Sequence, residues 1–242
     1  MKKIFLGLGV FALALAFIPM FAAFEAHVIN VTATIENALA VNPGEIAYGT
    51  VFPQEALDRS VDVRFSGSFS EEPTADDVNY AIKQKPKCIL VTDTQLPKYG
   101  RVTEDANNNF VCEDEVNYDI LPLLCPYLSK HERTPDGEGE NDSAGISAFH
   151  GLPGVWSPAT TNATAVAGRL AKSEQDLLDT WIIDLRVPCF AGTCSQDWDS
   201  FVLANNPNAI PADYIQPANM EHKLFGCDLW VEVNGISRIQ LP

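Results

Sequence analysis

The chain has 242 residues and an acidic balance of 32 Asp and Glu against 16 Lys and Arg, which gives a formal net charge of −16 at pH 7. Such a surface repels nucleic acid and anionic lipid headgroups, because both are negatively charged. Nucleic-acid binding is therefore excluded as a main function. The length suits one large all-β domain or two small ones, and we expect one.

The N-terminus has the pattern of a secretory signal. Lys2 and Lys3 precede an apolar run over residues 4–24, and small residues suited to cleavage stand near its end, up to Ala26. The alternative is an uncleaved anchor, because about 20 apolar residues can span a bilayer as a helix. We predict residues 1–26 as a signal peptide and the protein as secreted or cell-surface, with membrane contact only through this segment if it stays uncleaved.

The number of cysteines is even in a chain that is expected to leave the cytoplasm, and they are Cys88, Cys112, Cys125, Cys189, Cys194 and Cys227. Disulfides are the default interpretation in that setting, although sequence alone leaves the pairing open. Cys189 and Cys194 bracket a short turn and are the best candidates for a local bridge. The first three cysteines flank a long polar insertion that a bridge would constrain. A zinc cluster, the alternative, would need Cys-x2-Cys pairs that are absent here.

Alternation of apolar and polar residues predicts several β-strands. One is residues 27–35, and shorter ones are residues 46–52 and 227–233. Three further runs have a clear inward face, made by Val61, Val63 and Phe65, by Val78, Tyr80 and Ile82, and by Trp181, Ile183, Leu185 and Val187. Short strands at this spacing are typical of a sandwich. We therefore predict an all-β fold, an antiparallel jelly-roll-like β-sandwich, as a single domain over residues 27–242.

Two polar stretches are predicted as loop insertions into this sandwich, at residues 92–158 and 193–223. Both are rich in residues that favour turns and loops. Within the first, residues 120–128 are apolar but contain prolines, which favour an edge strand or an extended piece. Ser173 with Asp176 three residues later resembles a helix N-cap. We expect a single helical turn there and at most short helical turns elsewhere.

No catalytic motif is recognisable, so we predict that the protein is not an enzyme. A zinc protease needs two histidines one helical turn apart with a glutamate between them, but Pro135 stands where His131 would need its partner. A Gly-x-Ser-x-Gly nucleophile elbow is absent from the sequence as well. The other histidines are His27, His150 and His222. Because they are scattered, we expect all four imidazoles to face solvent separately.

The most specific polar cluster is an acidic loop with an oxygen donor at every second residue, formed by Asp136, Glu138, Glu140 and Asp142. Calcium takes about six to eight oxygen ligands, often from such glycine-containing loops. These carboxylates are therefore the candidate metal site, although their order is not that of an EF-hand. The alternative is a solvated acidic loop without a metal. No cofactor is required by the rest of the sequence.

The tryptophans bear on carbohydrate binding. Trp181 falls on the inward face of its strand and is predicted to lie in the core. Trp230 falls on the opposite side of its strand from its apolar neighbours, where it offers a contact surface. One such ring does not make a platform for a sugar. Sequons for N-glycosylation stand at Asn30, Asn141 and Asn162, and their use depends on the host.

Two segments resemble the secreted TasA and camelysin biofilm-matrix proteins and their archaeal pilus relatives. The first is the signal followed by the strand at residues 27–35 and then by Pro-Gly-Glu-Ile-Ala-Tyr-Gly-Thr-Val-Phe-Pro at residues 43–53. The second is Arg-Leu-Ala-Lys-Ser-Glu-Gln-Asp at residues 169–176, followed by Asp-Thr-Trp at residues 179–181 and an alternating strand. The two segments cover about a quarter of the chain.

The resemblance implies a jelly-roll-like sandwich and a fibre in which the N-terminal strand of each subunit completes the sheet of the next. In such strand addition, main-chain hydrogen bonds give affinity and alternating side chains give register. Residues 27–35 would be the donor, with an apolar face made of Ile29, Val31, Ala33 and Ile35. The cysteines and the long insertions depart from the family pattern. One family member is described as a metalloprotease, but this chain lacks the zinc motif.

The sequence therefore predicts a secreted or cell-surface structural or adhesive protein, and a filament subunit that assembles by strand donation. Its expected partners are other copies of itself or other surface proteins. The alternative is a monomeric extracellular module that binds calcium, a glycan or a protein through the loops of residues 92–158. Filaments that are lost when residues 27–35 are deleted would favour the first, and calcium-dependent melting would favour the second.

Overall fold

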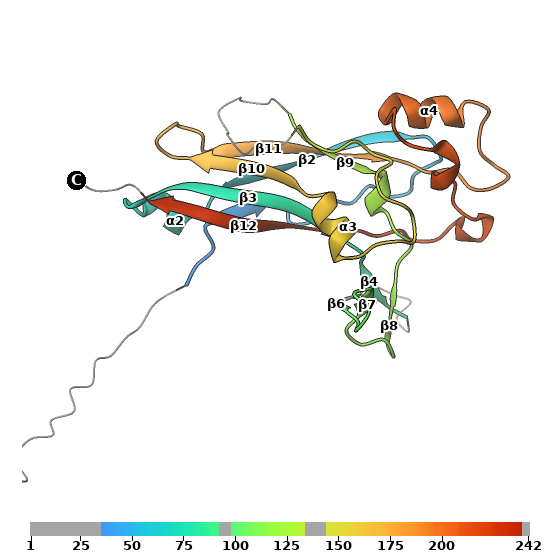
Figure 1. The fold of residues 1–242 in the computed structure, drawn as a ribbon, viewed down its shortest axis with the longest axis horizontal. Helices are drawn as coiled ribbons and strands as arrows, with labels where there is room; N and C mark the ends of the chain where they lie inside the picture. Colours follow the sequence, from blue (N-terminus) through green and yellow to red (C-terminus); the bar gives the residue numbers. More distant parts are fainter. Residues whose placement is uncertain (1–34, 92–97, 134–143, 239–242) are drawn as a thin grey trace, which may run out of the picture. The chain divides into compact units, whose positions relative to one another are not determined.

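The computed structural model of the protein describes residues 35–91, 98–133 and 144–238. The chain divides into two units, residues 1–36 and residues 37–242. The second unit carries the β-structure, and it is built from two antiparallel sheets that pack face to face, with β2, β9 and β11 in one layer and β3, β10 and β12 in the other (Figure 1).

Each layer has a defined strand order. Sheet A consists, in spatial order, of β1 (Leu39–Asn42), β2 (Ala56–Phe65), β11 (Leu178–Arg186) and β9 (Leu128–Glu132). Sheet B consists of β10 (Val166–Ala171), β3 (Ala75–Lys85) and β12 (Asp228–Arg238). All neighbouring strands in both sheets are antiparallel. The prediction of an all-β antiparallel sandwich is therefore confirmed, and the jelly-roll connectivity stays a prediction.

The core lies between the two sheets and is made by the inward faces predicted from the alternating patterns. The runs that begin at Val61, Val78 and Trp181 are each buried at every second residue. Trp181 is fully buried, and its indole N–H donates to the hydroxyl of Tyr80 on the opposite sheet at 2.7 Å. A buried indole needs such an acceptor, so this hydrogen bond links the two layers inside the core.

The first predicted insertion is folded rather than a run of long surface loops. Two small sheets lie beyond the α3 end of the sandwich (Figure 1). Sheet C consists of β5 (Tyr99–Gly100), β4 (Cys88–Leu90) and β8 (Tyr118–Ile120), and sheet D of β6 (Val102–Glu104) and β7 (Phe110–Cys112). A disulfide between Cys88 and Cys112 joins them. Because a cross-link restricts the unfolded chain, it lets these short strands persist.

The helices are short, as predicted. They are α2 (Gly67–Glu71), α3 (Pro158–Ala163) and α4 (Trp198–Asn205), with 3₁₀ turns η2 (Cys125–Tyr127), η3 (Pro211–Tyr214) and η4 (Ala218–Met220). Three of these elements, α4, η3 and η4, lie within the second predicted insertion, residues 193–223. No helix among the described residues is long and apolar enough to cross a membrane.

Two local predictions were wrong, and a third was right only in part. Residues 46–52 form no strand, because Gly49 adopts a positive φ of 77° and Tyr48 turns away to donate its hydroxyl to the carbonyl of Ile183 at 2.6 Å. The helical turn at Ser173 is instead the tight turn between β10 and β11, where the Ser173 backbone N–H donates to a carboxylate oxygen of Asp76 at 2.8 Å. The apolar stretch at residues 120–128 is the end of β8 and a 3₁₀ turn before the edge strand β9.

The disulfide prediction is confirmed for all six cysteines. Cys189 pairs with Cys194, the local bridge that the sequence suggested. Cys88 pairs with Cys112, and Cys125 pairs with Cys227 across 102 residues of sequence. The last bridge attaches the chain just before β12 to the turn that precedes β9. It therefore connects the last strand of sheet B with the edge of sheet A.

Candidate functional site

The outer edge of β12 is the longest unpaired strand edge in the described part of the chain. β12 has 11 residues and pairs with β3 alone. The other edge strands, β1, β9 and β10, have four, five and six residues. An edge strand presents a row of unpaired backbone N–H and C=O groups to any added strand. The pairing of β12 is regular from Asp228 to Val233, and bulges follow.

The inward face of β12 is incompletely covered. Leu229 and Val231 pack against the core but remain half-buried. Val233 lies opposite Tyr80 in the register, yet it is 39% exposed whereas Tyr80 is 1% exposed. Leaving apolar side chains of a sheet's inner face in water gives up the free energy of their burial. A further strand beside β12 would cover these side chains.

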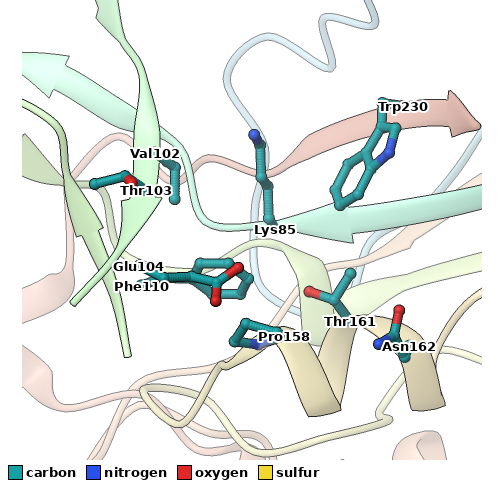
Figure 2. Close-up of a pocket in the computed structure, with 9 residues that line it drawn as sticks. All are labelled: Lys85, Val102, Thr103, Glu104, Phe110, Pro158, Thr161, Asn162 and Trp230. Carbon is teal, nitrogen blue, oxygen red and sulfur yellow. The ribbon is translucent and has the colours of Figure 1, made fainter. Parts of the chain in front are cut away.

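A groove of about 420 Å³ lies on the outer face of sheet B, close to the same strand. Lys85 of β3 and Trp230 of β12 are on one side of it, the helix α3 contributes Thr161 and Asn162, and sheet D contributes Glu104 (Figure 2). The other residues that line the groove are Val102, Thr103, Phe110 and Pro158. The groove is therefore formed where the first insertion meets the sandwich.

Trp230 is held in place by charged neighbours on the outer face. The ammonium of Lys85 lies 5.2 Å from the centre of its ring, within the range of a cation–π interaction. The indole N–H donates to Glu232 at 3.3 Å, and Glu232 in turn pairs with Lys83 at 3.0 Å. This chain of contacts fixes the orientation of the indole ring at the edge of the groove.

A second polar cluster lies inside the sandwich. Lys130 of β9 is fully buried, and its ammonium has no hydrogen-bond partner among the described residues. Burial lowers the pKa of Lys130 to about 7, because the uncharged amine is favoured away from water. His150 is buried as well, and its desolvation together with the charge of Lys130 lowers its pKa to about 3.

His150 is therefore neutral at pH 7. Its Nδ1 lies 2.7 Å from the carbonyl oxygen of Ser147, and its Nε2 lies 2.5 Å from the amide nitrogen of Gln84. Since a neutral imidazole has one donor and one acceptor, Nδ1–H donates to Ser147 and Nε2 accepts from Gln84. These contacts satisfy the ring within the core. The expectation that all histidines face solvent was wrong for His150, because Gln84 supplies an internal partner.

Only some of the remaining predicted site residues lie in the part of the chain that the structure describes. The candidate calcium ligands, Asp136, Glu138, Glu140 and Asp142, lie outside the described residues. So does the predicted donor strand, apart from Ile35, which is 93% exposed. His131 is half-exposed and its Nε2 lies 3.1 Å from a carboxylate oxygen of Asp184. Within residues 35–91, 98–133 and 144–238, no group of three or more metal-binding side chains comes together.

Sequence reasoning missed the groove. Its walls come from β3, sheet D, α3 and β12, which are far apart in the chain. The one available signal was the outward position of Trp230 in the last strand. Comparison with known proteins found no matching family model, no matching curated protein and no matching solved structure. The edge of β12 and the groove are therefore the candidate functional features of this chain.

Proposed function

We propose that the protein is a secreted or cell-surface building block that assembles by strand addition at the edge of β12. The observation that carries the proposal is the incomplete burial of the inward face of β12, from Leu229 to Val233, beside an unpaired backbone edge. Intramolecular disulfides are compatible with an extracellular location, because they persist in oxidising compartments. The resemblance to TasA and camelysin proteins implies the same mode of assembly.

The donor in this proposal is residues 27–35 of a neighbouring copy. Their alternating pattern puts Ile29, Val31 and Ala33 on one face, and the mainly polar set Val28, Asn30, Thr32 and Thr34 on the other. Paired with β12, such a strand would lay its apolar face over Leu229 and Val231 and turn its polar face to solvent. Main-chain hydrogen bonds would supply affinity, and the match of apolar faces would set the register.

The test compares the assembly of secreted, oxidised protein with that of a variant that lacks residues 27–35. Electron microscopy and light scattering at rising concentration should show polymers for the intact mature chain and monomers for the deletion. Two point variants sharpen the comparison: Val31→Asp places a charge on the apolar face and should prevent assembly, while Thr32→Asp places the same charge on the polar face and should permit it. Monomers in every case, or equal effects of both substitutions, would refute strand addition.

A second candidate function is a binding module that uses the first insertion. The observation that favours it is the groove, since residues of the insertion form one of its walls. The two functions are compatible, because the groove lies on the outer face of sheet B whereas strand addition uses its edge. Loss of assembly on deleting residues 27–35 would leave binding in the groove unchanged.

A further inference from the structure

The groove on the outer face of sheet B is a feature that strand addition does not use. Alternation along β12 puts Trp230 on the face opposite to Leu229 and Val231. In the register Trp230 lies opposite Lys83 of β3, whose side chain shares that outer face. An incoming strand at the edge would contact the inward residues. The groove is therefore left open for a ligand of its own.

The lining combines ring faces with polar groups. Trp230 is half-buried and presents an amphipathic indole, and Phe110 and Pro158 add two further rings. Asn162 and Thr103 are exposed and offer amide and hydroxyl groups. Aromatic rings give a ligand a large apolar contact at low entropic cost, while a few polar groups fix its orientation. Such a lining suits a ligand with apolar faces and many hydrogen-bonding groups.

The charge in the groove is balanced, unlike that of the whole chain. Lys85 contributes one positive charge and Glu104 one negative charge. The adjacent Lys83 and Glu232 neutralise each other at 3.0 Å. Strongly anionic or cationic ligands would gain little from such a lining, and the net charge of −16 opposes anions further. The groove therefore favours an uncharged polar ligand.

We propose that this groove binds a short neutral oligosaccharide. A pyranose ring has a C–H face that packs on an indole and hydroxyls that bond to amide, carboxylate and ammonium groups, which is the combination that the groove presents. Its volume of about 420 Å³ falls within the range of small-molecule sites. The sugar is either a free glycan or a glycan attached to the protein at Asn162. Asn162 is the attachment point because its exposed side chain lines the groove and it begins a sequon.

The free-glycan arm uses full-length secreted protein from a host that adds no N-glycans. Isothermal titration calorimetry is run with neutral trisaccharides of glucose, mannose and N-acetylglucosamine. At least one should bind, and Trp230→Ala should weaken its binding by about tenfold or more. The matched control is Tyr99→Ala: Tyr99 is exposed and also carries a lysine over its ring, at 4.0 Å, but lies outside the groove. The Tyr99→Ala variant should change the affinity for the trisaccharide by less than about twofold.

The attached-glycan arm uses protein from a host that performs N-glycosylation. Mass spectrometry locates any glycan at Asn162, and its enzymatic removal should increase the quenching of Trp230 fluorescence by acrylamide, relative to the same treatment of Trp230→Phe. Either arm alone supports the proposal and identifies the source. The proposal is overturned if no neutral trisaccharide binds and Asn162 carries no sugar that shields Trp230, or if only peptides or charged sugars bind.

Phe110→Ala serves as a second variant if Trp230→Ala fails to fold, which far-ultraviolet circular dichroism would show. Phe110 is half-buried in sheet D, and its loss should also weaken sugar binding. Binding that survives both substitutions would place the sugar elsewhere and contradict the assignment to the groove.

Discussion

The two edge strands of sheet B pair with the same central strand but differ in how well their inward faces are covered. On β10, Val166 and Leu170 are 2% and 0% exposed. On β12, Val233 is 39% exposed, although it faces the same side of the sheet. Every edge has unpaired backbone, so unpaired backbone alone does not identify a docking edge. Incomplete burial of the inward face distinguishes β12.

The two edges are also held in different ways. β10 continues through a tight turn at residues 172–175 into β11, and its inward side chains lie in the core. β12 begins directly after Cys227, which is bonded to Cys125. A covalent link therefore holds the start of β12 in a position where packing is incomplete. In the proposed assembly, this link would hold the edge of β12 in place before a further strand docks.

The largest expected effect is the loss of this link. Replacing Cys125 and Cys227 together by serine should lower the free energy of unfolding by about 4–5 kcal/mol, since the bridge closes a loop of 102 residues. The same change at Cys189 and Cys194, which close a short loop, should remove about 2 kcal/mol. Urea denaturation measures both. Equal losses would show that loop length does not set the contribution of the bridge at β12.

The second-largest expected effect is the difference in stability lost when a leucine is truncated on β10 and on β12. Leu170→Ala on β10 should cost about 3 kcal/mol, because it leaves a cavity in a closed core. Leu229→Ala on β12 should cost about 1 kcal/mol, because Leu229 is only half-buried and water can reach the site. Denaturation of the monomeric protein at low concentration measures the difference. A larger cost at Leu229 would mean that the edge of β12 is already covered in the monomer.

The edge strand β9 of sheet A can be compared with the two edge strands of sheet B. The outer edge of β9 is paired at one position, because the backbone of Lys130 exchanges two hydrogen bonds with Ile146, at 2.9 and 2.7 Å. Like Leu170 behind the edge of β10, Lys130 is fully buried behind this edge. The core therefore encloses the amine of Lys130 behind this edge. The enclosure explains why Lys130 titrates near neutrality.

This enclosure makes stability depend on pH in a defined direction. The pKa of Lys130 is lowered to about 7 in the folded protein, against about 10.4 in an unfolded chain. Between these values the unfolded state binds more protons, so stability should rise as pH increases from about 7 to about 10. Lys130→Met should abolish that rise and stabilise the protein at pH 7 by about 2 kcal/mol. Melting temperatures over this pH range provide the measurement.

His150 supplies the control for this experiment on the acid side. Its folded pKa of about 3 lies below that of a free histidine, about 6.5, so stability should fall as pH decreases through that interval. The Lys130→Met variant should still lose most of this stability in acid, because burial is the largest cause of the lowered pKa of His150. A variant that also lost the acid dependence would show that the two groups titrate as one unit.

The sequence predicted the layers of this molecule better than its edges. Inward positions such as Val63, Tyr80 and Trp181 follow from alternation, because a strand between two layers must bury every second side chain. The local bridge at Cys189 followed from spacing. Burial of His150 could not be predicted, since Gln84, which satisfies it, is 66 residues away. The groove was missed for the same reason, because four separate segments form it.

The smallest expected effect on stability is the most informative about assembly. Val233→Asp puts a charge at the half-open inward face of β12, where solvent can still hydrate it, so the monomer should lose no more than about 1 kcal/mol. The same charge would be buried when a strand docks, and an unpaired buried charge is strongly unfavourable. Assembly should therefore stop while the fold remains intact.

Leu203→Asp is the matched control, since Leu203 on α4 is 42% exposed, close to the 39% of Val233. Sedimentation of both variants, at the concentrations where the proposal expects the wild type to polymerise, separates the explanations. If assembly is lost only in Val233→Asp, the uncovered edge is the docking surface, because the two variants carry the same charge at similar exposure. If both assemble, β12 is only an edge strand, and the contact between copies must lie on another surface.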